Sequence, residues 1–219
     1  MISEITLPPA PLGLYLHIPW CPTRCIYCDF NTYVDGEASL KTRYHAALLR
    51  EMCEAGTALS RPALDTIFVG GGTPTTLPPD QLIELIETAK SAFNLRPGAE
   101  VTVEANPGTL SLDYLREIRQ GGINRLSLGV QSFNDAELRF LSRLHDAGAA
   151  RCTAQQARAA GFDNLSLDLI FNLPDQSLAQ WQQNLQAALD LAPDHLSLYA
   201  LIVEPGTPLH RQVAQGQVP

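Results

Sequence analysis

Apolar residues form six short runs along the chain, and each run is followed by a turn and then by a stretch with helical spacing of apolar positions. Several runs are apolar at nearly every position, which is typical of strands covered on both faces of a parallel sheet. We therefore predict strands at residues 14–18, 66–69, 101–104, 125–130, 164–170 and 195–202.

The stretches between these strands predict amphipathic helices. Ser111 and Ser177 are expected to cap two of them, because a serine side chain accepts a hydrogen bond from a free N–H group at a helix start. We expect the helices at about 39–56, from 80 onwards, at 111–121, after 135, at about 147–160 and at 177–191. Strict alternation of strand and helix requires parallel strands with right-handed crossovers, and so either a doubly wound sheet or a barrel.

The chain has 219 residues, whereas a complete barrel of eight strand–helix units takes about 250. Six units therefore predict an α/β fold of the partial (β/α)6 barrel type, in one core domain over residues 1–219. After Leu209 the sequence begins what looks like another helix and stops at Pro219. We therefore expect a protein truncated at its C-terminus, with a further domain absent from this sequence.

Charge and hydropathy exclude several classes of protein. Fifteen lysines and arginines against 23 acidic residues give a net charge of −8, which argues against a broad basic surface for nucleic acid. The chain lacks the apolar run of about 18 residues that a transmembrane segment needs. Residues 1–9 contain an acid and lack the apolar stretch of a signal peptide. These features predict a cytoplasmic protein that binds anionic ligands locally.

Three of the five cysteines, Cys21, Cys25 and Cys28, fall within eight residues. Such a cluster predicts thiolates that converge on a metal or an iron–sulfur cluster. The odd total argues against a disulfide framework. For Cys53 and Cys152 we expect buried, small apolar side chains.

Three thiolates are an incomplete ligand set, which leaves one metal position open for a substrate, an added ligand or water. An open position favours chemistry over a purely structural role. The alternative is a zinc-stabilised binding module, in which His17, four residues before Cys21, supplies the fourth ligand.

Other polar residues follow the predicted strands, where the loops of parallel α/β folds converge on one mouth. The triple glycine at 70–72 lets the backbone approach a ligand closely. An acid can hold an ammonium group, an arginine can hold a carboxylate, and an aspartate can accept hydrogen bonds from ribose hydroxyls. A pocket for a zwitterionic ligand with a ribose is therefore predicted around Glu104, Gln131, Arg143 and Asp168.

The Cys-x3-Cys-x2-Cys motif after the first strand, with Gly-Gly-Gly-Thr-Pro-Thr after the second, resembles the radical S-adenosylmethionine (SAM) superfamily. The segments Leu14-Tyr-Leu-His-Ile-Pro-Trp-Cys21 and Cys28-Asp-Phe-Asn are similar to one branch of it. That branch contains the oxygen-independent coproporphyrinogen III oxidases and their HemW-type haem-chaperone relatives. The resemblance spans nearly all of the chain.

The resemblance implies a [4Fe-4S] cluster on the three clustered cysteines, with its fourth iron chelated by the amino and carboxylate groups of SAM. It further implies that the reduced cluster passes one electron to the SAM sulfonium and splits it into methionine and a 5'-deoxyadenosyl radical, so that an electron donor is needed. Positions matching contacts to this SAM are Tyr15, Gly71 and Glu104. Positions matching contacts to a second SAM in the oxidase are Tyr27, Gly72, Thr73, Gln131, Arg143 and Asp168.

One departure separates the two members of this branch. The oxidases usually carry a fourth cysteine two residues beyond the third, where this chain has Phe30. The resemblance therefore favours the HemW-type chaperones, which are understood to bind haem and deliver it to haem-requiring respiratory proteins. Haem is expected only in the full-length protein, because the haem-binding residues of the family are thought to lie in the absent C-terminal domain. Radical decarboxylation in porphyrin biosynthesis remains the alternative, and we assign no catalytic residue.

Overall fold

The structure is a computed structural model that describes residues 11–34 and 36–218. Residues 1–9, on which the expectation about a signal peptide depends, lie outside the described residues. The strands are β1 (Gly13–Ile18), β2 (Trp20–Cys21), β3 (Tyr33–Val34), β4 (Ala63–Gly71), β5 (Asn94–Ala105), β6 (Arg125–Gln131), β7 (Asn164–Phe171) and β8 (His195–Ala200). The helices are α1 (Ala38–Ala58), α2 (Pro79–Ala92), α3 (Leu112–Gln120), α4 (Asp135–Phe140), α5 (Ala147–Ala159), α6 (Leu178–Leu189) and α7 (Pro208–Ala214), with a 3-10 turn at Pro74–Thr76.

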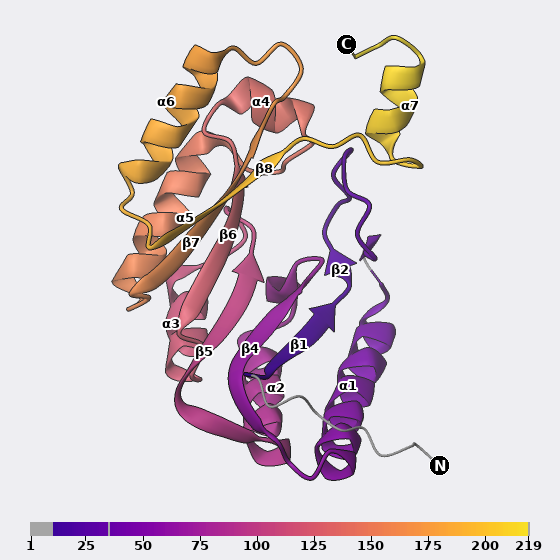
Figure 1. The fold of residues 1–219 in the computed structure, drawn as a ribbon, viewed down its shortest axis with the longest axis vertical. Helices are drawn as coiled ribbons and strands as arrows, with labels where there is room; N and C mark the ends of the chain where they lie inside the picture. Colours follow the sequence, from indigo (N-terminus) through magenta and orange to yellow (C-terminus); the bar gives the residue numbers. More distant parts are fainter. Residues whose placement is uncertain (1–10, 35, 219) are drawn as a thin grey trace.

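Six strands form one parallel sheet in the order β1-β4-β5-β6-β7-β8. Helix α1 contacts α2, α2 contacts α3, and α3 contacts α5, so that the helices form a layer over one face of the sheet (Figure 1). Within the described ranges, none of the helices combines the length and apolar character that a membrane crossing requires. The expected partial barrel of six parallel strands is confirmed, because each strand–helix unit of the sequence forms one unit of the fold.

The two faces of the sheet differ in chemistry. Leu126 and Leu128 are fully buried on the helix-covered face, whereas Ser127 between them donates a hydrogen bond to Asp168 on the concave face. The same alternation along β7 places Ser166 between two buried leucines, and its hydroxyl pairs with the His195 ring. Both faces of these strands are buried, as expected, but the concave face carries polar side chains. Polar side chains are stable there because they form hydrogen bonds to one another.

The cysteine motif lies in a loop closed by a small second sheet. Strands β2 and β3 pair in parallel, with Trp20 opposite Tyr33 and Cys21 opposite Val34. Two-residue strands have no periodicity, so the sequence pattern could not predict them. Within the loop, the Arg24 side chain donates to the carbonyls of Cys28 and Phe30, both at 3.2 Å.

Helix α7 returns to the same loop from the other end of the chain. Its Leu209 is fully buried, and the Leu209 N–H donates to the carbonyl oxygen of Ile26 at 2.9 Å. Thr207 caps α7 by accepting a hydrogen bond from the N–H of His210. The segment between Cys25 and Cys28 is thus supported by one of the last elements of the chain.

The two remaining cysteines contradict the sequence-based expectation. Cys53 on α1 and Cys152 on α5 are both exposed. Their neighbours Met52 and Thr153 take the buried positions of the two helices instead. A helix turns by about 100° per residue, so one position can decide whether a side chain faces the core.

A buried polar network fixes the turn after β6. The Glu137 carboxylate accepts hydrogen bonds from the Ser132 hydroxyl at 2.5 Å and from the Asn184 amide at 2.7 Å. The Asn184 oxygen in turn accepts from the N–H of Phe133 at 2.6 Å. Helix α6 is thereby linked to the turn that follows Gln131.

Replacing Asn184 by alanine is expected to destabilise the fold by about 2–3 kcal/mol, because it removes one of the two hydrogen bonds to a buried carboxylate oxygen and leaves the N–H of Phe133 without a partner. Gln183 is exposed on the same helix, so Gln183→Ala should change stability by less than about 0.5 kcal/mol. Urea unfolding followed by circular dichroism measures both. Equal midpoints for the two variants would contradict the structural role of this network.

Candidate functional site

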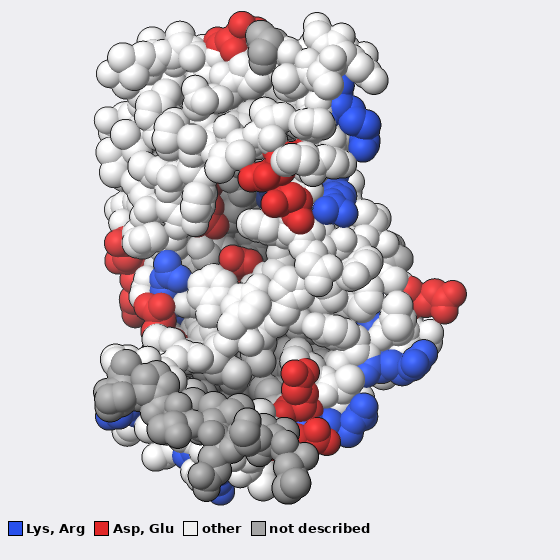
Figure 2. Space-filling model, turned by 45° about the vertical axis from the view of Figure 1, so that its right-hand side comes forward, with Lys and Arg blue, Asp and Glu red and all other residues white. Residues whose placement is uncertain are grey.

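Loops at the carboxyl ends of the sheet strands enclose a cavity of about 520 Å³. Figure 2 shows a hollow on one face of the molecule with acidic side chains in it. Of the site residues predicted from the sequence, all but Tyr15 line this cavity, namely Cys21, Cys25, Tyr27, Cys28, Gly71, Gly72, Thr73, Glu104, Gln131, Arg143 and Asp168. The convergence of strand ends explains why residues far apart in the sequence meet here.

The three clustered cysteines are free thiols, each half-buried, at the rim of this cavity. The N–H of Cys28 donates to the carbonyl oxygen of Cys25 at 3.2 Å, which forms a tight turn between them. Burial raises the pKa of Cys21 and of Cys28. Because metals bind thiolates, loading the site must release protons.

A zinc ion fits this arrangement poorly. A zinc site draws its sulfur ligands to about 2.3 Å from one ion, and among the described residues no three His, Cys, Asp or Glu side chains are placed to hold a single metal ion. Both ring nitrogens of His17, the suggested fourth ligand, already have partners. Nδ1 pairs with the Tyr15 hydroxyl and Nε2 with the carbonyl oxygen of Asn31, each at 2.9 Å.

Thr73 and Arg143 each donate a hydrogen bond to a cysteine sulfur. The Thr73 hydroxyl donates to the Cys21 Sγ at 3.7 Å, and Arg143 Nη1 donates to the Cys25 Sγ at 3.4 Å. Arg143 Nη2 donates to the carbonyl oxygen of Gly129 at 2.7 Å and to the Asn106 side-chain oxygen. The sequence analysis did not identify Asn106, although its position directly after β5, in the segment Glu104-Ala-Asn-Pro107, was a usable signal.

The glycines after β4 permit a close approach of two backbones. Gly71 has a φ of 115°, in the region that favours glycine. A Cβ atom on Gly72 would lie 2.6 Å from the carbonyl oxygen of Trp20 and 3.0 Å from the Cys21 Sγ. Any side chain at position 72 would therefore push away the strand that carries Cys21.

Two carboxyl groups face the cavity from neighbouring parts of the sheet. Glu104 accepts a hydrogen bond from the N–H of Gly71 at 3.1 Å, and burial, together with the nearby Asp168, raises the pKa of Glu104 to about 7. Burial also raises the pKa of Asp168, which accepts from the Ser127 hydroxyl at 3.2 Å. A cationic or hydroxyl-bearing ligand would relieve the cost of burying these two acids.

Gln131 lies at the end of β6 in a strained conformation. Its φ is 67°, which is uncommon for a residue other than glycine. The register between β6 and β7 also shifts between Leu128 and Gln131. Backbone strain of this kind is concentrated at binding sites, where the surrounding structure holds it in place.

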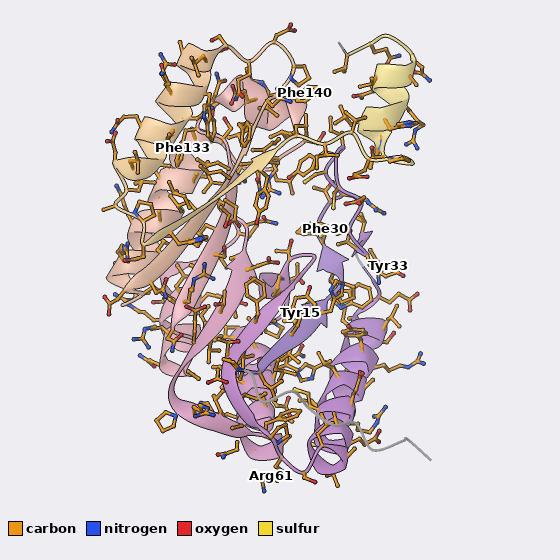
Figure 3. All side chains as sticks on the ribbon, in the orientation of Figure 1. Tyr15, Phe30, Tyr33, Arg61, Phe133 and Phe140 are labelled. Atoms are coloured by element: carbon orange, nitrogen blue, oxygen red, sulfur yellow. The ribbon has the colours of Figure 1, made fainter. Side chains whose placement is uncertain are left out.

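Tyr15 and Phe30 differ in their relation to the cavity. Tyr15 lies on β1 with its ring stacked on Phe68, at 6.1 Å between ring centroids, and it does not line the cavity. Phe30 is 66% exposed and lines the cavity mouth, two residues beyond Cys28. Figure 3 labels both side chains and shows Phe30 beyond the end of β1.

Comparison with known proteins identifies the family of this chain. The family model of the radical SAM superfamily matches residues 15–188. The chain belongs to the radical SAM superfamily. Membership implies a [4Fe-4S] cluster and SAM as cofactors.

Several proteins named heme chaperone HemW are similar to this radical SAM chain. The protein of Mycobacterium tuberculosis is 41% identical over 97% of this chain and 55% of its own length. The protein of Escherichia coli is 40% identical over 90% of this chain and 52% of its own length. The chain thus spans about half the length of the curated relatives it matches.

Solved structures give the same fold. Coproporphyrinogen III oxidase (HemN) from Escherichia coli superimposes with a TM-score of 0.86 at 31% identity, over 95% of this chain and 48% of the oxidase. The archaeal Elp3 of Methanocaldococcus infernus has a TM-score of 0.67 at 16% identity, over 94% of this chain and 50% of its own, and shows the shared fold alone.

The residues present fit a cluster and SAM. The three thiols come from one loop, face one cavity, and are accompanied by a glycine turn that leaves room beside Cys21. Arg143 Nε is buried without a hydrogen-bond partner, so that a donor remains available in the cavity wall. These features match a ligand set for a cluster with an anionic group beside it.

The raised pKa of Glu104 predicts a pH-dependent stability of the metal-free protein. Between the ordinary pKa of 4.5 and about 7 the folded state binds the extra proton, so stability falls as the pH rises through this window. At about 1.4 kcal/mol per pKa unit, the loss is about 3 kcal/mol at most. Glu104→Gln should therefore match the original protein at pH 5 and be more stable at pH 8, as measured by urea unfolding.

The titration of His145 changes stability with pH in the opposite direction, so its contribution must be separated from that of Glu104. Burial, with the nearby Arg143, lowers the pKa of His145 to about 4, and the folded state therefore loses stability as the pH falls below 6.5. This contribution is common to both proteins and cancels in their difference. Parallel pH profiles for the variant and the original protein would contradict the assignment to Glu104.

Proposed function

We propose that this chain provides the cluster-binding and SAM-binding core of a haem chaperone of the HemW type, and that residues 1–219 form this core as one domain. The observation that supports it most directly is the set of three free thiols at one cavity with Glu104 and Arg143. In this proposal Cys21, Cys25 and Cys28 hold three irons of a [4Fe-4S] cluster. SAM then occupies the position that the thiols leave open.

Different residues of the cavity suit different groups of the SAM molecule. The two acids, Glu104 and Asp168, suit its ammonium group and its ribose hydroxyls, because both are hydrogen-bond donors. Gly71 and Gly72 have no side chains, so a ligand beside the cluster can approach their backbone closely. The reduced cluster supplies an electron to the SAM sulfonium when both are bound.

The remaining predicted contacts complete this site. Arg143 carries the positive charge that a SAM carboxylate requires, and Tyr27, Thr73 and Gln131 line the same wall. Tyr15 contributes through the concave face of β1, where burial and the nearby Glu104 raise the pKa of its hydroxyl. Whether these residues contact one SAM or two is decided by the stoichiometry of SAM binding.

The chaperone is preferred to the oxidase because the HemW relatives are up to 41% identical to this chain, against 31% for the oxidase structure. Phe30 at the cavity mouth supports the same choice, since it cannot replace a cysteine ligand. Haem, a haem-accepting respiratory protein and an electron donor are the partners of the whole protein in this proposal. We assign no haem ligand among the residues of this chain.

The cofactor assignment is tested by anaerobic reconstitution with iron and sulfide, followed by reduction and electron paramagnetic resonance. We expect a reduced [4Fe-4S] signal that changes when SAM is added and is lost in Cys25→Ala. Cys53→Ala is the matched control, because Cys53 is exposed on α1 and should leave the signal unchanged. A signal that persists in Cys25→Ala, or ignores SAM, would sink the assignment.

A second experiment separates the chaperone from the oxidase. The reconstituted protein is incubated with coproporphyrinogen III, SAM and a reductant, and the release of carbon dioxide is measured. We expect none from this chain. We expect haem to bind at one equivalent, in an absorbance titration, to a form of the protein that extends over the full length of its HemW relatives. Decarboxylation would establish the oxidase alternative.

A further inference from the structure

A continuous chain of hydrogen bonds joins two of the cysteine sulfurs through three side chains. It runs from the Cys21 Sγ to Thr73, from Thr73 to Asn106, from Asn106 to Arg143, and from Arg143 to the Cys25 Sγ. Thr73 follows β4, Asn106 follows β5, and Arg143 follows α4. Asn106 is the central member and touches neither sulfur in these contacts.

The chemistry of the neighbours fixes the orientation of the Asn106 amide. A guanidinium group can only donate hydrogen bonds, so the Asn106 oxygen must face Arg143. The amide nitrogen then faces Thr73 and donates to its Oγ1 at 2.8 Å. Rotating the amide by 180° would set two donors against each other at Arg143.

This orientation determines where the Thr73 hydroxyl points. A threonine hydroxyl has a single hydrogen, and its oxygen here already accepts from Asn106. The hydrogen is therefore free to be donated to the Cys21 Sγ, at 3.7 Å. Thr73 is only 2% exposed, so water does not compete for this position.

Asn106 also fixes the other end of the chain. Arg143 Nη2 is shared between the Asn106 oxygen and the carbonyl oxygen of Gly129, which aims Nη1 at the Cys25 Sγ, 3.4 Å away. A Cβ atom on Gly129 would lie 3.0 Å from the Asn106 oxygen and 3.4 Å from Arg143 Nη2. The absence of a side chain at position 129 thus makes room for this pair.

We propose that Asn106 is a positioning residue that holds Thr73 and Arg143 against the sulfurs of Cys21 and Cys25 and thereby raises the reduction potential of the bound cluster. Hydrogen bonds to cluster sulfurs favour the reduced state, because that state carries more negative charge. The positive charge of Arg143 acts in the same direction. This inference rests on the proposed function, since it requires that the three cysteines hold a cluster.

The test is a redox titration of the reconstituted protein, followed by electron paramagnetic resonance in the absence of SAM. SAM is left out because Thr73 and Arg143 are also proposed SAM contacts. Asn106→Leu keeps the size of the side chain and removes both hydrogen bonds. We expect the equilibrium constant for cluster reduction to fall about tenfold, which is ~59 mV for a one-electron couple.

A double-mutant cycle with Thr73→Val distinguishes positioning from a direct effect. Thr73→Val removes only the hydroxyl bond to Cys21, so its shift should be smaller than that of Asn106→Leu. Because Asn106 acts partly through Thr73, the shift in potential of the double variant should be smaller than the sum of the two single-variant shifts. Thr73→Ser retains the hydroxyl and should restore the original potential.

Asn124→Leu is the matched control for a general loosening of the fold. Asn124, directly before β6, accepts from the N–H of Val101 at 2.8 Å and donates to the carbonyl oxygen of Ala99 at 2.9 Å, in the middle of β5. It should lower stability and leave the potential unchanged. An unchanged potential in Asn106→Leu, or an equal shift in Asn124→Leu, would overturn the inference.

Two further outcomes are also decisive. If Asn106→Leu retains no cluster, Asn106→Asp is measured in its place. Aspartate has nearly the shape of asparagine and still accepts a hydrogen bond from Arg143. It accepts from Thr73 instead of donating to it, and so turns the Thr73 hydroxyl away from Cys21. Its potential must then fall together with that of Thr73→Val, and an unchanged value rejects the proposal. If the original protein holds no cluster, the proposed function itself fails.

Discussion

The site depends on the contact between the end of β4 and the backbone just before the cysteine loop. The N–H of Gly72 donates to the carbonyl oxygen of Ile18, and the N–H of Thr73 donates to that of Trp20, both at 2.8 Å. These two bonds extend the sheet beyond its last regular pair and bring Thr73 to the sulfur of Cys21. The glycine at 72 is required because the backbones are too close for a Cβ atom between them.

The same sheet separates structural stability from chemistry. Alternate residues of the central strands are aliphatic side chains buried against the helices, and burial of such side chains is the dominant favourable contribution to folding. The residues between them carry hydroxyl, carboxyl and guanidinium groups on the concave face. Partly buried acids such as Glu104 and Asp168 are tolerated there because the apolar layer on the other face compensates for their cost.

The fold could be predicted well from the sequence because the pattern of a strand followed by a helix occurs six times. Every strand of the main sheet is followed by its own helix, so that an error in one unit would not have changed the architecture. The motif residues were also brought together as expected, with the exception of Tyr15, which lies further down β1. Strand ends meet at one mouth in any parallel α/β fold, and this rule needs no detailed geometry.

What the sequence could not supply depends on distances of a few ångströms. The position of Asn106 after a strand could be read from the sequence, but its contacts with Thr73 and Arg143 could not. The burial of Cys53 was wrongly predicted because one step along a helix turns the side chain by about 100°, enough to move it from the core to the surface. The two-residue strands β2 and β3 exist only as a consequence of the loop that they close.

The hydrogen bond from Leu209 to Ile26 has a consequence for the order of events during synthesis. The cysteine loop is made near the start of translation, but this support for it leaves the ribosome only after almost all of these residues have been joined. Arg143 and Asn106 also emerge long after the three thiols. A metal loaded onto the nascent loop would therefore meet an incomplete pocket, and the finished site becomes available for loading only when this part of the chain has folded as a unit.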